Sequence, residues 1–211
     1  MTAADLATLA PELRVALARA LGRLLRPEPI ANYVRVSRAH HRDTPLEATA
    51  GPSRFSPRAH IPAANPPFKV LYLAENLCAA LYETVVRDRF DLLPDRVLEP
   101  EHYSDHVAFE ISTRPGVALA LLDLTGANAS KSGVPTDVLH HSKHDAGQHF
   151  AEFVRSEMPD IDGILYESRF TRYTAVAVFD HAADLLAAIH TEDLDRLLVQ
   201  SALSYLDITV R

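Results

Sequence analysis

The sequence predicts a single α+β domain in which helices flank a central mixed β-sheet. The chain has 211 residues, 47% of them hydrophobic, which is enough to bury one sizeable core. Strand-type and helix-type apolar spacings both recur, and the predicted strands outnumber those of a simple strand–helix alternation. No internal repeat and no linker divides the chain. We assign residues 1–30 to an N-terminal helical extension and residues 31–211 to the main domain.

Composition narrows the class of protein. The formal net charge of −7 argues against a general nucleic-acid binder, so we expect no direct contact with nucleic acid. Cys78 is the only cysteine, which excludes an internal disulfide framework and suits a reducing compartment. We see no basic-then-apolar leader and no apolar run long enough for a bilayer. A cytoplasmic protein without membrane attachment is therefore expected.

The first third of the chain combines a helix, a strand and a long loop. An apolar stripe of leucines predicts a helix over residues 11–26, ended by the prolines that follow. Residues 33–37 read as a strand with Arg35 at its centre. Such an arginine either faces water on an edge strand or needs a partner or an anionic ligand when buried. Residues 45–67 contain six prolines and predict an irregular loop, in which Arg54 follows a turn.

A strand over residues 70–74 runs directly into a helix. Alternation places Tyr72 on the face opposite to Leu71 and Leu73. Asn76 is suited to cap the helix, because its side-chain oxygen can accept from free amides of the first turn. Glu83 lies off the apolar stripe of this helix, four residues before Arg87. It is either half of a solvated ion pair or a carboxylate at the rim of a pocket, and this stretch alone favours the ion pair.

The second half predicts alternating strands and helices. Strands are expected at 106–112, 117–125, 164–168, 174–179 and 185–189, and helices at 146–158 and 192–205. Residues 114–116 read as a turn between the first two strands. Tyr166 and Ser168 share one face of the strand at 164–168.

Common signatures of nucleotide and hydrolytic enzymes are absent, and two charged clusters remain. The chain has no Gly-x-Gly-x-x-Gly, P-loop, His-Glu-x-x-His or Gly-x-Ser-x-Gly motif. His140 and His144 would share a face if they lay on one helix, a geometry that can hold zinc, but their polar surroundings favour a solvated surface. No metal site is expected. Residues 35–60 hold five arginines against two acidic residues, which suits either a small anionic ligand or a solvated loop.

The polar residues on these elements form an ordered series. Arg35 stands in Tyr33-Val34-Arg35-Val36, Glu83 ends Ala79-Ala80-Leu81-Tyr82-Glu83, and Ser168 stands in Tyr166-Glu167-Ser168-Arg169. This order resembles the RES domain family, which is named for an Arg, a Glu and a Ser. Tyr72 matches the family's strand tyrosine and Arg54 its loop arginine. Two residues separate Gly51 from Arg54, whereas the family usually places a glycine directly before that arginine. The resemblance spans residues 33–179.

The resemblance implies an ADP-ribosyltransferase-like fold and a RES-like catalytic domain over residues 31–211. RES proteins are typically toxins of toxin–antitoxin pairs that destroy NAD⁺ by hydrolysis or phosphorolysis, each blocked by an antitoxin with an Xre-type helix-turn-helix domain. NAD⁺ would then be a substrate, and no cofactor is expected. Two alternatives stay open, namely transfer of ADP-ribose to a protein target and a non-catalytic interaction module. The sequence also leaves a homo-oligomer open.

The residue types agree with that chemistry. Cleavage of the nicotinamide–ribose bond passes through an oxocarbenium-like centre, which a carboxylate such as Glu83 can stabilise. Arg35 and Arg54 can hold the anionic pyrophosphate through charge-assisted bonds, with Arg35 also in a catalytic role. Tyr72 offers a ring for the nicotinamide or ribose, and Ser168 a hydroxyl that can bind the ribose or the carboxamide.

Overall fold

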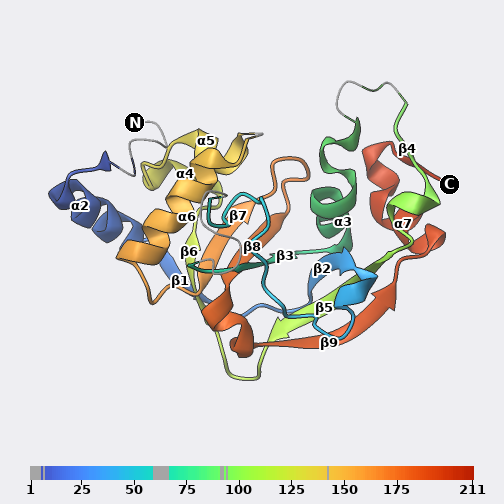
Figure 1. Ribbon diagram of the computed structural model, residues 1–211, viewed down its shortest axis with the longest axis horizontal. Coiled ribbons are helices and arrows are strands. Elements are labelled where there is room, and N and C mark those ends of the chain that lie inside the picture. Colours follow the sequence, from blue (N-terminus) through green and yellow to red (C-terminus); the bar gives the residue numbers. More distant parts are fainter. Residues whose placement is uncertain (1–5, 7, 59–66, 91–92, 94, 142) are drawn as a thin grey trace.

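A curled eight-stranded sheet forms the centre of the computed structural model, which describes residues 6, 8–58, 67–90, 93, 95–141 and 143–211 (Figure 1). The strand order is β1-β6-β7-β8-β3-β2-β5-β9, and the sheet is mixed because β6 and β7 run parallel while the other neighbours run antiparallel. Its strands are β1 (Leu25–Glu28), β2 (Tyr33–Arg38), β3 (Val70–Ala74), β5 (His106–Thr113), β6 (Leu119–Asp123), β7 (Gly163–Glu167), β8 (Thr174–Phe179) and β9 (Leu186–Asp193). A small second sheet pairs β4 (Val97–Leu98) with β10 (Thr209–Val210). The predicted α+β class is confirmed.

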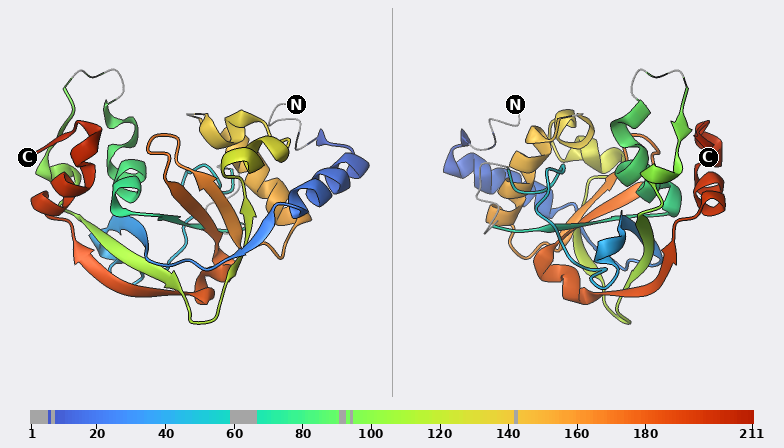
Figure 2. Two further views of the ribbon diagram at one scale, coloured as in Figure 1. Left: turned by 180° about the vertical axis from the view of Figure 1, so that it is seen from behind. Right: turned by 45° about the vertical axis from the view of Figure 1, so that its right-hand side comes forward.

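Helices lie in two groups against the sheet, and the views of Figures 1 and 2 agree on this arrangement. The first group consists of α2 (Pro11–Gly22), α4 (Gly126–Lys131), α5 (Thr136–His140) and α6 (Asp145–Glu157). The second consists of α3 (Leu77–Leu81), the π-helical turn η2 (Tyr82–Val86) and α7 (Arg196–Leu203). Short 3₁₀ turns are η1 (Ala39–His41), η3 (Arg87–Phe90), η4 (Pro100–His102), η5 (Asp180–Leu185) and η6 (Ser204–Leu206).

Strand alternation explains how the core is divided. Leu71 and Leu73 of β3 pack into a cluster with Phe109 of β5 and Leu119 of β6. The sheet therefore curls around one of its faces, so that side chains from distant strands meet in one core. Tyr72 points the other way, toward the helix-covered face, as the alternation predicts. The helices cover that second face with two further apolar clusters, one for each helix group.

The sheet is open between β2 and β3. These strands pair at a single position, Val34 with Ala74, whereas β2 pairs with β5 along its whole length. At the far end of β3, an isolated bridge joins Thr49 to Val70. An opening therefore remains between β2 and β3, with the Val34–Ala74 pair at one end and the Thr49–Val70 bridge at the other. The loop after β2 closes this opening, and the site described below lies in it.

The N-terminal helix is shorter than predicted. It ends at Gly22 rather than near residue 26, and residues 25–28 form β1, which pairs antiparallel with β6. Pro27 is compatible with this strand because β1 lies at the edge of the sheet, where a missing N–H is tolerated. Leu21 is fully buried in the main core. The domain boundary at residues 30/31 stays a prediction.

The C-terminal helix also begins later than predicted. Residues 186–193 belong to β9, which extends the strand expected at 185–189, and α7 starts only at Arg196. Asp195 sets this start by accepting a hydrogen bond of 2.8 Å from the backbone N–H of Leu198.

The strands predicted at 106–112, 117–125, 164–168 and 174–179 and the helix at 146–158 are confirmed to within two residues. Of the proline-rich loop, residues 59–66 lie outside the described residues. Within the described chain, no helix has the length and apolar character needed to cross a membrane.

Candidate active site

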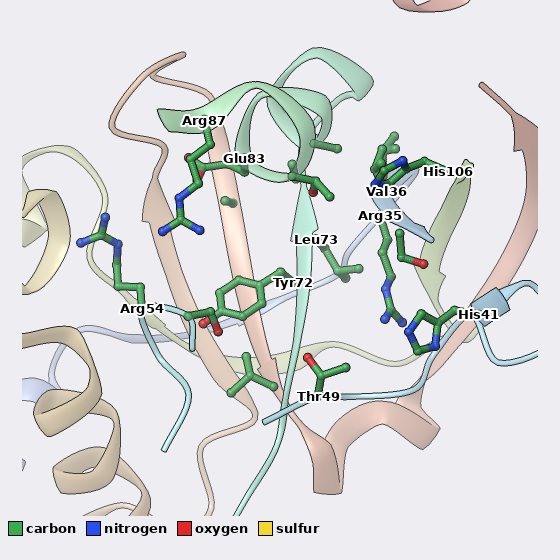
Figure 3. Close-up of a pocket in the computed structure, with 18 of the residues that line it drawn as sticks. Arg35, Val36, His41, Thr49, Arg54, Tyr72, Leu73, Glu83, Arg87 and His106 are labelled. Carbon is green, nitrogen blue, oxygen red and sulfur yellow. The ribbon is translucent and has the colours of Figure 1, made fainter. Parts of the chain in front are cut away.

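A cavity of about 430 Å³ fills the opening between β2 and β3 and extends beneath η2 (Figure 3). Its size is within the usual range for small-molecule sites. Four of the five residues predicted for the site line this cavity, namely Arg35, Arg54, Tyr72 and Glu83. The fifth, Ser168, lies behind the wall and is fully buried.

Ser168 fixes the carboxylate of Glu83. Its hydroxyl donates a hydrogen bond of 2.6 Å to Glu83 Oε1, and accepts longer ones from the backbone N–H groups of Phe170 and Thr171. The strand and the helix that carry the two residues are thereby tied together at the cavity wall. In this structure Ser168 contacts the carboxylate, and its predicted contact with a substrate stays a prediction.

Local structure places Glu83 in a wide helical turn. Asn76 caps the preceding helix as predicted, accepting 3.0 Å from the N–H of Ala79. The helix then widens into the π-turn η2, a form that is rare and often found at functional sites. The turn ends at Arg87 with a positive φ of 27°, and the guanidinium of Arg87 contacts His144 Nε2. Glu83 therefore lies in the wall of a cavity, the second of the two arrangements that its sequence context left open.

Arg35 is buried on an interior strand. The alternative of a water-facing arginine on an edge strand is wrong, because β2 lies between β3 and β5 and Arg35 is 7% exposed. Its Nη1 donates 2.6 Å to the carbonyl oxygen of Pro45. Burial lowers the pKa of Arg35 to about 10, against the opposing charge of Glu47, so the guanidinium stays protonated at neutral pH.

Arg54 is held by the first helix group. Its Nη1 donates to the carbonyl of His141 at 3.1 Å, and its backbone lies so close to α6 that only a glycine fits at position 147. Burial also lowers the pKa of Arg54. The sequence of the loop at Gly51–Arg54 departs from the usual RES pattern, yet Arg54 still lines the cavity.

Tyr72 separates the two arginines. Its hydroxyl accepts 2.8 Å from the backbone N–H of Phe55, and burial raises its pKa. Figure 3 shows Arg54 on one side of the Tyr72 ring and Arg35 on the other. The two arginines therefore stand at different ends of the cavity and do not form one clamp.

A family model for the RES domain matches residues 32–204. The chain belongs to the RES domain family. Among solved structures, the RES domain is similar to the MbcT toxin in the crystal structure of the M. tuberculosis MbcT–MbcA toxin–antitoxin complex. That match has a TM-score of 0.62 and 19% identity and covers 89% of this chain and 97% of the other, so it shows the shared fold. A search of the curated proteins found no match.

The cavity of this RES domain is electropositive although the whole chain is acidic. Four arginines line it among the described residues, Arg35, Arg38, Arg54 and Arg87, against the single carboxylate of Glu83. Three of the five arginines noted at positions 35–60 thus face the cavity. Of these three, Arg38 also pairs with Asp105, while Arg42 and Arg58 pair with Asp193 and Glu152.

Several cavity residues of the RES domain were not predicted. Tyr166 could have been found from its position two residues before Ser168 on the same strand face. His41, Thr49 and His106 are brought in by the closing loop and by β5, and no local pattern marks them.

The histidines of positions 140–149 do not share one helix face. His140 ends α5, whereas His144 precedes α6, where its Nδ1 lies 2.9 Å from the carbonyl oxygen of Pro52. No cluster of three or more His, Cys, Asp or Glu side chains suited to a metal ion occurs in the described part of the chain. His144 therefore joins the proline-rich loop to η2 through its contact with Arg87.

Proposed function

We propose that this RES domain degrades NAD⁺ by breaking the bond between nicotinamide and ribose, and that it acts as the toxin of a toxin–antitoxin pair. The observation that carries the proposal is Glu83, a carboxylate held by the buried hydroxyl of Ser168 in an arginine-lined cavity of about 430 Å³. NAD⁺ offers both groups that such a cavity suits, a cationic glycosidic centre and an anionic pyrophosphate.

The reaction requires stabilisation of positive charge on the ribose. As the C1′–N bond breaks, C1′ and the ring oxygen become oxocarbenium-like, and a fixed carboxylate lowers the energy of that state. Glu83 is fixed in this way by Ser168. Nicotinamide leaves as a neutral molecule and needs no strong acid, so one carboxylate is sufficient where an ordinary glycosidase uses two.

Substrate binding uses the remaining cavity residues. Arg54 and Arg87 lie on the Glu83 side of the cavity (Figure 3) and are suited to the pyrophosphate, because guanidinium groups bind phosphate oxygens in a bidentate manner. The ring of Tyr72 provides a flat surface for the nicotinamide or ribose. Arg35 contacts the substrate from the opposite end. In this proposal Ser168 acts as a positioning residue through Glu83.

The biological role is proposed from the similarity to the MbcT toxin. That toxin was crystallised in a toxin–antitoxin complex with MbcA. We expect an antitoxin for this chain as well, with an Xre-type helix-turn-helix domain, and a cytoplasmic site of action where NAD⁺ is abundant.

The first experiment follows NAD⁺ over time with the purified chain and with Glu83→Gln, in buffers with and without phosphate. The wild type should consume NAD⁺, and Glu83→Gln should be slower by about 10²- to 10³-fold, the usual loss for one electrostatic group. Glu192→Gln, at an exposed position on β9, is the matched control. ADP-ribose as product means hydrolysis, and ADP-ribose phosphate formed only with phosphate means phosphorolysis.

Stable NAD⁺ with the folded wild type would contradict the proposal. Transfer of label from tagged NAD⁺ to proteins of a lysate would then favour a protein ADP-ribosyltransferase. Growth inhibition that persists in Glu83→Gln would instead favour a non-catalytic interaction module.

A further inference from the structure

The Arg35 end of the cavity contains polar groups that the proposed function leaves without a role. Ser37, His41 and Thr49 line this end. Within the described part of the chain, Ser37 Oγ is buried without a hydrogen-bond partner. Buried hydroxyls nearly always have a partner, so a free one in a cavity wall indicates a place for a small polar ligand.

His41 is oriented by an acidic neighbour. It ends η1, the turn that directly follows β2, and its Nδ1 lies 3.3 Å from Glu47 Oε2. The same carboxylate accepts 2.9 Å from the hydroxyl of Thr44, which fixes its position. A carboxylate at Nδ1 favours the tautomer with the proton on Nδ1, and this leaves Nε2 with a free lone pair. The pair therefore has the arrangement of a general base and its orienting group.

The two ends of the cavity lie on opposite faces of the sheet. Because side chains alternate along a strand, Arg35 and Ser37 share one face of β2. Tyr72 lies on the helix-covered face, together with the turn that carries Glu83. Figure 3 shows Arg35 and His41 pointing into the end away from Glu83. A ribose placed in the opening would meet Glu83 from one side and His41 from the other.

We propose that the end formed by Arg35, Ser37 and His41 binds the attacking water, and that His41, oriented by Glu47, is the general base that activates it. This inference rests on the proposed NAD⁺ cleavage. The water oxygen bonds to C1′ of the ribose as the C1′–N bond breaks, and the electron pair of that bond stays on the nicotinamide nitrogen. The water proton passes to His41 Nε2 and then to solvent. The products are ADP-ribose, nicotinamide and one proton. Attack from the side opposite to the leaving group is the geometry of inverting glycoside hydrolysis.

The test is chemical rescue of His41→Ala. Removal of a general base slows the reaction by about 10²- to 10⁴-fold. Azide is a nucleophile that carries no proton to be removed, so it should restore NAD⁺ consumption by the variant and yield azido-ADP-ribose. Glu47→Gln should show a smaller loss, because the base is present but less well oriented. His190→Gln, at an exposed position on β9, should behave as wild type.

The outcomes separate this inference from the proposed function. If the wild type leaves NAD⁺ intact, both are overturned. If the wild type consumes NAD⁺ and His41→Ala keeps its rate, only the role of His41 is overturned. A slow His41→Ala that azide does not accelerate, with unchanged thermal stability, also overturns it. A wild type that consumes NAD⁺ only when phosphate is present, and then forms ADP-ribose phosphate instead of ADP-ribose, excludes water as the nucleophile.

Discussion

At the residue scale, the most informative contact is the one between Ser168 and Glu83. A serine that is fully buried beside a carboxylate cannot exchange its bond for one with water. Its hydroxyl therefore determines which way the carboxylate oxygen points. This makes Ser168 a residue whose effect on turnover should exceed its effect on substrate affinity.

We predict that Ser168→Ala lowers kcat for NAD⁺ by about 10- to 100-fold, the equivalent of losing one hydrogen bond to a charged group. KM should change little, because Ser168 does not line the cavity. Steady-state kinetics measure both constants. Ser130→Ala, on the exposed surface of α4, provides the comparison. An equal rise in KM with unchanged kcat would assign Ser168 to substrate binding instead.

At this scale the sequence predicts the residue types of the site and the strand faces that carry them, but not which side chains reach the cavity. Tyr72 and Ser168 were placed on the correct faces because strand alternation is local. Whether Ser168 reached the cavity or stopped behind Glu83 depended on the packing of β7 against η2, which brings together parts of the chain that are far apart in sequence. The sequence leaves the edge-strand and buried alternatives for Arg35 open for the same reason, since strand order is a tertiary property.

At the element scale, the loop that carries Arg54 is fastened to α6. Gln148 donates 3.1 Å to the carbonyl of Ser53, and Arg58 pairs with Glu152. Gly147 allows the loop backbone to lie directly on the helix. The position of Arg54 in the cavity thus depends on a helix whose own residues do not line the cavity.

We predict that Gly147→Ala displaces this loop. An added Cβ would lie 2.5 Å from the carbonyl oxygen of Arg54, so the loop or the helix must move. We expect a loss of about 1–3 kcal/mol in stability, as for other overpacked positions, and a raised KM for NAD⁺. Denaturant unfolding and steady-state kinetics measure these effects. Gly22→Ala, with no atom within 4 Å of the added Cβ, should leave both quantities near wild type. A fully stable Gly147→Ala with normal KM would show that the loop does not determine the position of Arg54.

Element boundaries show where local signals are sufficient. The helix at 146–158 was predicted closely because Phe150, Phe153 and Val154 form a clear apolar edge. The stripe at the N-terminus was extended too far, because Leu25 continues the helical spacing but is used in β1. The strand pairing with β6 determines that boundary, and no local residue signals it.

At the scale of the whole molecule, an acidic chain presents an arginine-lined cavity. The net charge is −7, while the cavity carries four arginines against one carboxylate among the described residues. Charge-assisted binding of an anionic substrate in an open cavity weakens as salt screens it.

We therefore predict that KM for NAD⁺ rises with NaCl between about 50 and 500 mM, a range in which the screening length falls to a few ångströms. The value of kcat should change less. Arg54→Gln should raise KM at low salt and show a smaller salt dependence, because one of the screened charges is gone. A KM that is independent of salt in the wild type would show that the arginines contribute little to substrate binding.

The strand order has a consequence for how the protein is made. β2 and β3 follow each other in the chain but barely pair, and β3 takes its full partner only from β8, Thr174–Phe179. When synthesis has reached residue 167, Arg35, Arg54, Tyr72 and Glu83 have already been made. Ser168 and β8, the strand that pairs with Tyr72 and its neighbours, have not. Sheets built from such distant pairings form late. The arrangement around Glu83 and Tyr72 therefore cannot be complete before synthesis has passed residue 179, and under the proposed function a shorter nascent chain would not degrade NAD⁺.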